Sequence, residues 1–186
     1  MKYPYPSQKK QENLEYGQSI VNAFCTHNGL NPPKIKNATR TRDYGYYKWG
    51  STTIHVNEKL VRVPVKTPGF SWSYTGYKAD LTGAGIIAHE TGHYVDCLLN
   101  MPSQRIEKAV KGEKCVSSYE PDCHEIFAES MKLFILNPNL LQVGRPKRYE
   151  FLTELGLSPV ITDSWEDVLT HAHPKLILAA KNWIVR

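Results

Sequence analysis

The sequence predicts an α+β protein in which a small sheet precedes a mainly helical part. Residues 44–57 contain two short runs of β-type residues around a Gly-Ser turn. From residue 80 onward, apolar residues recur at helical spacing in segments that proline and glycine separate. The 186 residues, 41% hydrophobic and 22% charged, fit one domain over 1–186, with a helical and loop lead-in over 1–43, a sheet over 44–78 and helices over 80–186.

The first half of the chain predicts one helix and a few short strands. The helix covers about residues 12–29 and ends at Gly29, just before a Pro-Pro pair. Residues 51–57, "STTIHVN", predict an edge strand that an extended peptide can join. Residues 60–65 predict a further strand whose alternation is broken by Pro64, and residues 67–77 form a loop rich in glycine and aromatic residues.

Two long helices dominate the second half. The first covers about Leu81–Asn100 and stops before Pro102, and the second covers about Asp122–Leu136 and stops at an Asn-Pro pair. Three shorter helices are predicted after them, near Pro146–Leu155, Ser164–His171 and Pro174–Val185.

Charge and cysteine content narrow the class of protein. The 23 Lys and Arg exceed the 18 Asp and Glu, an excess too diffuse to indicate nucleic-acid binding. No apolar run suits a secretory signal or a membrane span, so we expect a cytoplasmic protein, or one exported without a classical signal peptide, with no transmembrane segment. The four cysteines are interpreted as buried thiols, with a Cys115–Cys123 disulfide as the alternative.

Residues 87–98, "IAHETGHYVDCL", contain the pattern His-Glu-x-x-His. On a helix, His89 and His93 project from one face and can turn a ring nitrogen to the same ion. Glu90 lies about 100° around the helix from His89, beside the ion, where a base for a metal-bound water is needed. The opposite face is apolar and can pack into a core, which leaves the histidines facing a cleft.

Two further features of this helix carry expectations. Glycines cost a helix up to about 1 kcal/mol each relative to alanine, so their presence indicates other elements packed closely against its backbone. These glycines are Gly83, Gly85 and Gly92. Asp96 shares the histidine face, and it either hydrogen-bonds a ligand or its neighbours or is a solvated polar residue.

A catalytic zinc needs a third protein ligand, and the second helix, "DCHEIFAESMKLFIL", offers one. Glu125 and Glu129, with Lys132, form the only polar strip of this otherwise apolar helix. Buried carboxylates need partners, and a metal with its histidines is one. We assign Glu125 as the third ligand and Glu129 as the residue that hydrogen-bonds a ligand histidine; the reverse assignment stays open, as does a capping role for Glu125 with Asp122.

These segments resemble the anthrax lethal factor-like metallopeptidases, within the gluzincins. In that family a helix with His-Glu-x-Gly-His, often followed by aspartate, is joined by a downstream helix with Glu-Phe-Phe-Ala-Glu; here the segments read "HETGHYVD" and "EIFAES". A later proline-basic stretch running into Tyr-x-Phe is similar to "RPKRYEFL". The resemblance covers about residues 80–155.

The resemblance implies a zincin-like fold and one Zn²⁺ per chain. By residue-by-residue match, His89, His93 and Glu125 are the zinc ligands and Glu90 is the general base, and Glu129 supports them. The family also uses a tyrosine upstream of the ligand helix to assist the oxyanion. Tyr119 is the candidate for that catalytic role, with Tyr149 or a loop tyrosine as the alternative.

The expected function is that of a zinc-dependent endopeptidase acting on a protein or peptide substrate. One alternative keeps the metal in a DNA-associated protease of the SprT-like kind, whose usual third ligand is a histidine; His124 is poorly aimed for that role, since it points about 100° away from Glu125. The other alternative is a zincin-scaffold binding protein without turnover. The presence of Glu90 argues against it.

Overall fold

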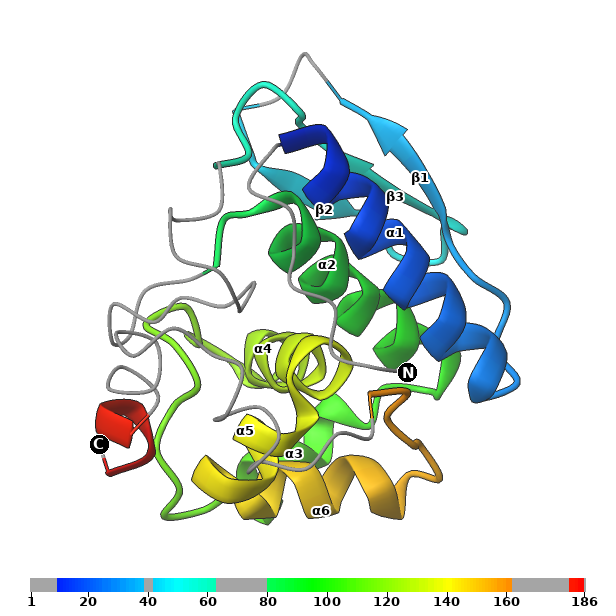
Figure 1. Cartoon of the computed structure of the whole chain (residues 1–186). Coiled ribbons are helices and arrows are strands. Elements are labelled where there is room, and N and C mark those ends of the chain that lie inside the picture. Colours follow the sequence, from blue (N-terminus) through cyan, green and yellow to red (C-terminus); the bar gives the residue numbers. More distant parts are fainter. Residues whose placement is uncertain (1–9, 39–41, 63–79, 162–180, 186) are drawn as a thin grey trace.

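The computed structural model describes residues 10–38, 42–62, 80–161 and 181–185, and these form a mixed α+β fold. Helix α2 is at its centre, since it contacts α1, α4, β2 and β3. In Figure 1, α1 and α2 lie between the sheet and the group formed by α4, α5 and α6. The named elements are α1 (Lys10–His27), β1 (Lys34–Asn37), β2 (Gly45–Tyr47), β3 (Thr53–Val56), α2 (Gly83–Leu98), α3 (Ser103–Ala109), α4 (Cys123–Leu136), α5 (Pro138–Gly144) and α6 (Pro146–Glu154).

The sheet has the order β1-β3-β2 and corrects the predicted edge strand. Strand β3 lies within the predicted segment 51–57, but it pairs in parallel with β1 and antiparallel with β2, so it is the central strand. Strand β1 was not predicted, because its four residues, "KIKN", include a single apolar side chain; in the structure they are mostly exposed. The lead-in therefore contributes a strand, and the edge nearest α2 is β2.

The backbones of α4 and α1 approach the backbone of α2 closely on two sides. A Cβ on Gly92 would lie 2.6 Å from the Ala128 Cα of α4. On the side of α1, a Cβ on Gly17 would lie 2.6 Å from the Ala84 Cα of α2. The close packing predicted from the glycines of this helix is thus confirmed.

The ends of both long helices have clear causes. Thr82 caps α2 by accepting a hydrogen bond from the Gly85 amide. The helix stops where Asn100 and Met101 adopt left-handed backbone conformations, with φ of 62° and 63°. The Asp122 side chain caps α4 by accepting from the next amides along the chain, so the predicted start and the end at Leu136 are confirmed.

Other predictions are met in part. Helix α1 ends before Gly29, whose φ is +67°, and α6 covers most of the predicted 146–155. The short helices α3 and α5 were not predicted. Residues 181–185 are helical. In the predicted strand 60–65, the described residues 60–62 form a turn and an isolated bridge from Arg62 to Thr82 and no strand; residues 63–65, the loop 67–77 and the predicted helical residues 164–171 and 174–180 lie outside the described residues.

Two findings concern cysteines and membranes. All four cysteines are free, so the alternative of a Cys115–Cys123 disulfide is not met, and only Cys25 is fully buried. Among the described residues, every helix falls short of the length and apolar character that crossing a bilayer requires.

Candidate metal centre

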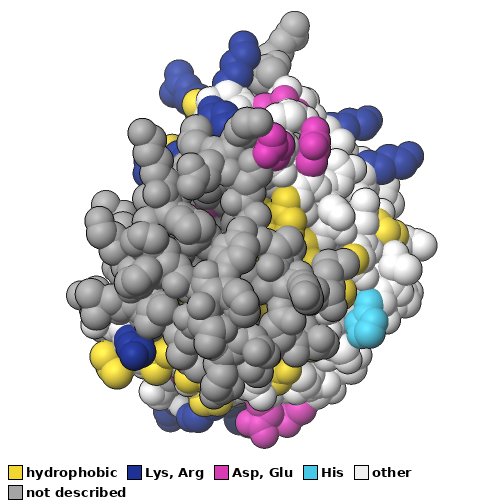
Figure 2. All heavy atoms as spheres, viewed as in Figure 1, with side chains coloured by type: hydrophobic (Ala, Val, Ile, Leu, Met, Phe, Trp, Pro, Cys, Tyr) yellow, Lys and Arg dark blue, Asp and Glu magenta, His cyan; other side chains and the backbone are white. Residues whose placement is uncertain are grey.

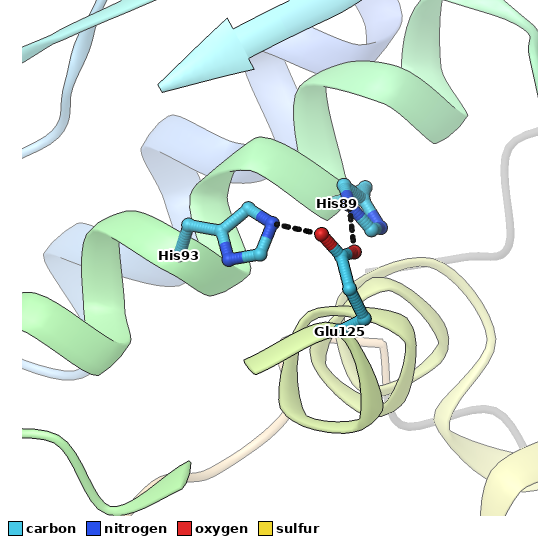
Figure 3. Close-up of side chains that lie close together, drawn as sticks. All are labelled: His89, His93 and Glu125. Carbon is cyan, nitrogen blue, oxygen red and sulfur yellow. Dashed lines mark ion pairs between the residues drawn. The ribbon is translucent and has the colours of Figure 1, made fainter. Parts of the chain in front are cut away.

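Three donor groups from two helices converge beside β2. His89 and His93 project from α2, and Glu125 reaches them from the first turn of α4 (Figure 3). The Glu125 Oε2 atom lies 3.1 Å from His89 Nε2, and its Oε1 atom lies 3.6 Å from His93 Nε2. One donor atom from each residue lies within 4.8 Å of the others. This cluster can bind a metal ion.

His89 is linked through Glu129 to Lys132 by buried polar contacts. The His89 Nδ1 atom is 2.8 Å from Glu129 Oε1, and the other oxygen of Glu129 accepts a 2.6 Å hydrogen bond from Lys132 Nζ. Both Glu129 and Lys132 are almost fully buried. Because Nδ1 is engaged by the carboxylate, the ring presents Nε2 to the ion position, as is usual for a metal-ligating histidine.

The electrostatics favour a positive charge between the two carboxylates. Burial lowers the pKa of His89, but Glu125 and Glu129 outweigh it and raise that pKa to about 10. Burial raises the pKa of Glu125, yet His89 and His93 bring it down to about 2. A proton or a metal ion can supply the charge, and binding of a metal would release the proton.

Glu90 lies beside the three donors and faces the same cavity. Burial raises its pKa, while the imidazoles of His89 and His93 and a hydrogen bond from the Tyr47 backbone lower it, and Glu125 raises it. The net result is a pKa above the usual carboxyl value. A carboxylate of raised pKa next to a metal site is well suited to accept a proton near neutral pH.

Tyr119 lies over the site on the loop that precedes α4. Its ring centroid is 5.8 Å from that of His89, and about half of the side chain is exposed. The Glu125 carboxylate, followed by burial, raises the pKa of the Tyr119 hydroxyl, which keeps it a hydrogen-bond donor. Tyr149, the alternative, instead packs against Phe134.

Hydrogen bonds of Glu120 and Arg148 hold the loop that carries Tyr119 in place. Glu120 accepts hydrogen bonds from the Val116 and Ser117 amides and from Arg148 Nη2, at 2.9 Å for the last. Arg148 is 2% exposed and also donates to Ser130 of α4. Arg148 therefore connects the loop to the helix that carries Glu125. No role was predicted for Arg148, whose position in the basic stretch "RPKR" does not reveal its burial.

Asp96 does not support the metal ligands through any hydrogen bond among the described residues. Its carboxylate accepts from the Ser103 amide and hydroxyl at 2.9 and 2.7 Å, and it lies 3.1 Å from His124 Nδ1. The side chain is completely buried, so it is not the solvated residue of the other interpretation. It lies one turn past His93, where its partners come from α3 and α4.

The donor set fits a divalent cation. The cavity holding it has a volume of about 650 Å³ and opens toward the β2 edge. Its lining includes the buried carboxylates of Asp80, Glu90 and Glu129 and the partly buried carboxylate of Glu125, while Lys132 supplies a buried amino group beside Glu129, so a dication offsets an excess of negative charge. The buried Glu125 Oε2 atom makes no well-formed hydrogen bond, as expected of an atom directed at an ion.

Comparison with protein-family models, with curated proteins and with solved structures finds no match to this chain.

Proposed function

We propose that this protein is a zinc-dependent endopeptidase with a zincin-like fold. The observation that carries the proposal is the convergence of His89, His93 and Glu125 on one point, with Glu90 beside it in an open cavity. Two histidines and one glutamate, with a position left for water, are the ligand set of catalytic rather than structural zinc.

The spacing of the donors supports zinc in particular. Ligand atoms at about 2.0–2.2 Å from a tetrahedral zinc lie roughly 3.3–3.6 Å from each other. Glu125 Oε2 lies 3.1 Å from His89 Nε2, Glu125 Oε1 lies 3.6 Å from His93 Nε2, and one donor atom of each residue lies within 4.8 Å of the others, so small side-chain movements bring the three donors to that spacing. Mixed imidazole and carboxylate donors suit zinc better than calcium or magnesium, which take oxygen ligands.

Each polar residue of the site has a role in the proposed hydrolysis. When bound, zinc supplies a Lewis acid that activates water for attack on a peptide carbonyl. Glu90 accepts the proton of the attacking water and delivers it to the leaving amine. The Tyr119 hydroxyl donates a hydrogen bond to the oxygen that gains negative charge, and Glu129 keeps His89 in the tautomer that binds the ion.

A peptide substrate fits along β2, which replaces the strand first expected to receive it. β2 is an edge strand and its residues 45–47 line the cavity. The Tyr47 backbone already bonds Glu90, and the Tyr44 carbonyl accepts a hydrogen bond from the Asn57 amide just after β3, so strand alternation turns the backbone groups of Gly45 toward the cavity. These groups are available to pair with an extended chain.

The two alternatives receive less support. A DNA-associated protease would use a histidine as third ligand, but His124 Nδ1 is bonded to Asp96 and the ring lines a different pocket. On the face in Figure 2, the Lys and Arg side chains of the described residues lie scattered at the rim and do not gather in a basic patch. A binding protein without turnover has no need of Glu90 in the position it holds.

The test is cleavage of a mixed peptide library, with new termini read by mass spectrometry. We expect the zinc-loaded wild type to cut, Glu90→Gln to lose at least about a thousandfold in rate, and a chelator to abolish cleavage. Glu107→Gln, at an exposed glutamate of α3, is the matched control and should cut at the wild-type rate. Wild-type protein that binds zinc but cuts neither peptides nor proteins would contradict the proposal.

A further inference from the structure

A second, smaller pocket opens beside the candidate metal centre. It has a volume of about 270 Å³. Its lining side chains come from the β2–β3 hairpin, α2 and the segment after it, and the first turn of α4: Tyr47, Trp49, His93, Met101 and His124. We call it the Trp49 pocket. Because His93 lines both cavities, the Trp49 pocket lies next to the ion position.

The walls of this pocket are aromatic and uncharged. Trp49 is 47% exposed, which is unusual for so large an apolar side chain. Its ring lies 6.2 Å from that of Tyr47 at 64° and 5.9 Å from that of His124 at 71°. The described lining consists of the rings of Tyr47 and Trp49, two imidazoles and the thioether of Met101, and these residues include no carboxylate, lysine or arginine.

Asp96 holds two of the walls in place. Its carboxylate fixes the His124 ring through Nδ1 at 3.1 Å, and Ser103 Oγ lies 2.9 Å from the same nitrogen. Its backbone carbonyl accepts a 2.8 Å hydrogen bond from the Met101 amide. A completely buried carboxylate is costly unless it is well bonded; here two of its bonds come from Ser103 at the start of α3, and its contact with His124 orients a wall of the Trp49 pocket.

The Met101 wall is held in a strained conformation. Asn100 and Met101 have φ of 62° and 63°, in a left-handed region that asparagine sometimes adopts but that a side chain such as methionine rarely does. The thioether is further tied by a contact of 3.8 Å from Gln104 Nε2. On the hairpin side, the Tyr47 hydroxyl donates to the Ser51 carbonyl at 3.1 Å and closes the turn that carries Trp49. Strain retained around a pocket points to a binding role.

We propose that the Trp49 pocket binds a single aromatic side chain of the peptide substrate, next to the bond that the metal centre cleaves. This inference rests on the proposed peptidase function for its occupant. The pocket is smaller than the roughly 300–1,000 Å³ of sites for whole small molecules, which suits one side chain. Ring walls and a thioether favour an aromatic group by edge and sulfur contacts, and the uncharged lining disfavours Asp, Glu, Lys and Arg side chains.

Binding can be tested without any catalysis, on the full-length protein with ¹³C-methyl methionine. The probe is N-acetyl-phenylalanine amide, and N-acetyl-alanine amide is its control. In NMR spectra we expect a saturable change in the chemical shift of the Met101 methyl group with the aromatic probe only, because the ring current of a bound aromatic group changes the local magnetic field at that methyl. The signal of Met131, which is completely buried in α4, should stay unchanged.

Variants make this result specific. Trp49→Ala should weaken binding of the aromatic probe by about twofold to twelvefold, since aromatic pairs contribute about 0.5–1.5 kcal/mol beyond burial. Val143→Ala, at an exposed apolar residue of α5, should bind as the wild type does. Equal shifts with the alanine probe, or unchanged affinity in Trp49→Ala, would overturn the proposal.

Cleavage then links the pocket to the reaction. In the peptide library, wild-type cuts should be enriched in Phe, Tyr or Trp at one position beside the cleaved bond, and Trp49→Ala should lose that enrichment while still cutting other peptides. Cutting whose preference does not depend on Trp49 would overturn the pocket and leave the peptidase intact. Saturable binding of the aromatic probe without any cutting would overturn the peptidase and support the pocket.

Discussion

Replacing Lys132 with methionine should destabilise the protein strongly. Lys132 is 2% exposed, and its amino group lies 2.6 Å from a Glu129 oxygen. Methionine has a similar length and fits the same space, but it carries no charge. The variant therefore removes a buried cation while it leaves the buried carboxylate in place.

The expected cost follows from that imbalance. Removing one partner of a buried ion pair costs about 3–5 kcal/mol, because the remaining charge loses its compensation. His89 keeps its own contact with Glu129 at 2.8 Å, which places the expected loss near the lower end, about 3 kcal/mol. This is a large fraction of the roughly 5–15 kcal/mol that stabilises a typical domain.

Urea unfolding followed by circular dichroism, with a chelator present, measures the free energy of unfolding without a contribution from metal. Lys108→Met, at an exposed lysine of α3, is the matched control and should change it by less than about 0.5 kcal/mol. The double variant Lys132→Met with Glu129→Gln should recover much of the loss, because no unpaired carboxylate remains. A loss below about 1 kcal/mol in Lys132→Met, or no recovery in the double variant, would refute the reasoning.

Three further predictions concern the surroundings of the site. Burial raises the pKa of the Asp80 carboxyl to about 6 from the usual 3.8. The protonated carboxyl therefore stabilises the folded state at low pH, and this contribution is lost as the pH rises from about 4 through about 6. Asp80→Asn should lack this part of the pH dependence of the free energy of unfolding, measured in urea. Gly92→Ala should lower the free energy of unfolding by about 1–2 kcal/mol in thermal scans, because the clash with Ala128 outweighs the gain in helix propensity. Zinc at about a hundredfold excess over its Kd should raise the same free energy by about 2.7 kcal/mol, and His93→Ala should remove the effect. An equal response to zinc in that variant would contradict the assigned ligand.

Helices α2 and α4 could be predicted because their signals are local. The spacing of His89 and His93, and the polar strip of Glu125 and Glu129 on an apolar helix, are visible in short windows of sequence. The cap at Asp122 and the glycines of α2 are equally local. On α4 the Asp122 side chain caps the helix and accepts from the Glu125 amide, while the Glu125 carboxylate faces the two histidines, so the cap leaves that carboxylate unused.

What the sequence failed to predict depends on contacts between distant segments. Strand β1 has no alternation of its own and exists because β3 pairs with it, so the strand order could not be inferred from either segment alone. The partners of Asp96 come from α3, a seven-residue helix too short for a clear apolar period, and from His124 of α4. The left-handed conformation of Met101 has no signal in a non-glycine residue.

The close approach of glycine and alanine on both sides of α2 also limits how this protein can respond to a ligand. With Gly92 against Ala128 and Gly17 against Ala84, α2 has almost no space in which to slide or rotate between its neighbours. Strand β2 is also close to α2, since a Cβ on Gly45 would clash with Ile86 Cγ2, but the side chains of Trp49 and Tyr119 are half-exposed. We therefore expect any induced fit to a ligand to be confined to these two side chains and their turns, while His89 and His93 on α2 keep their positions.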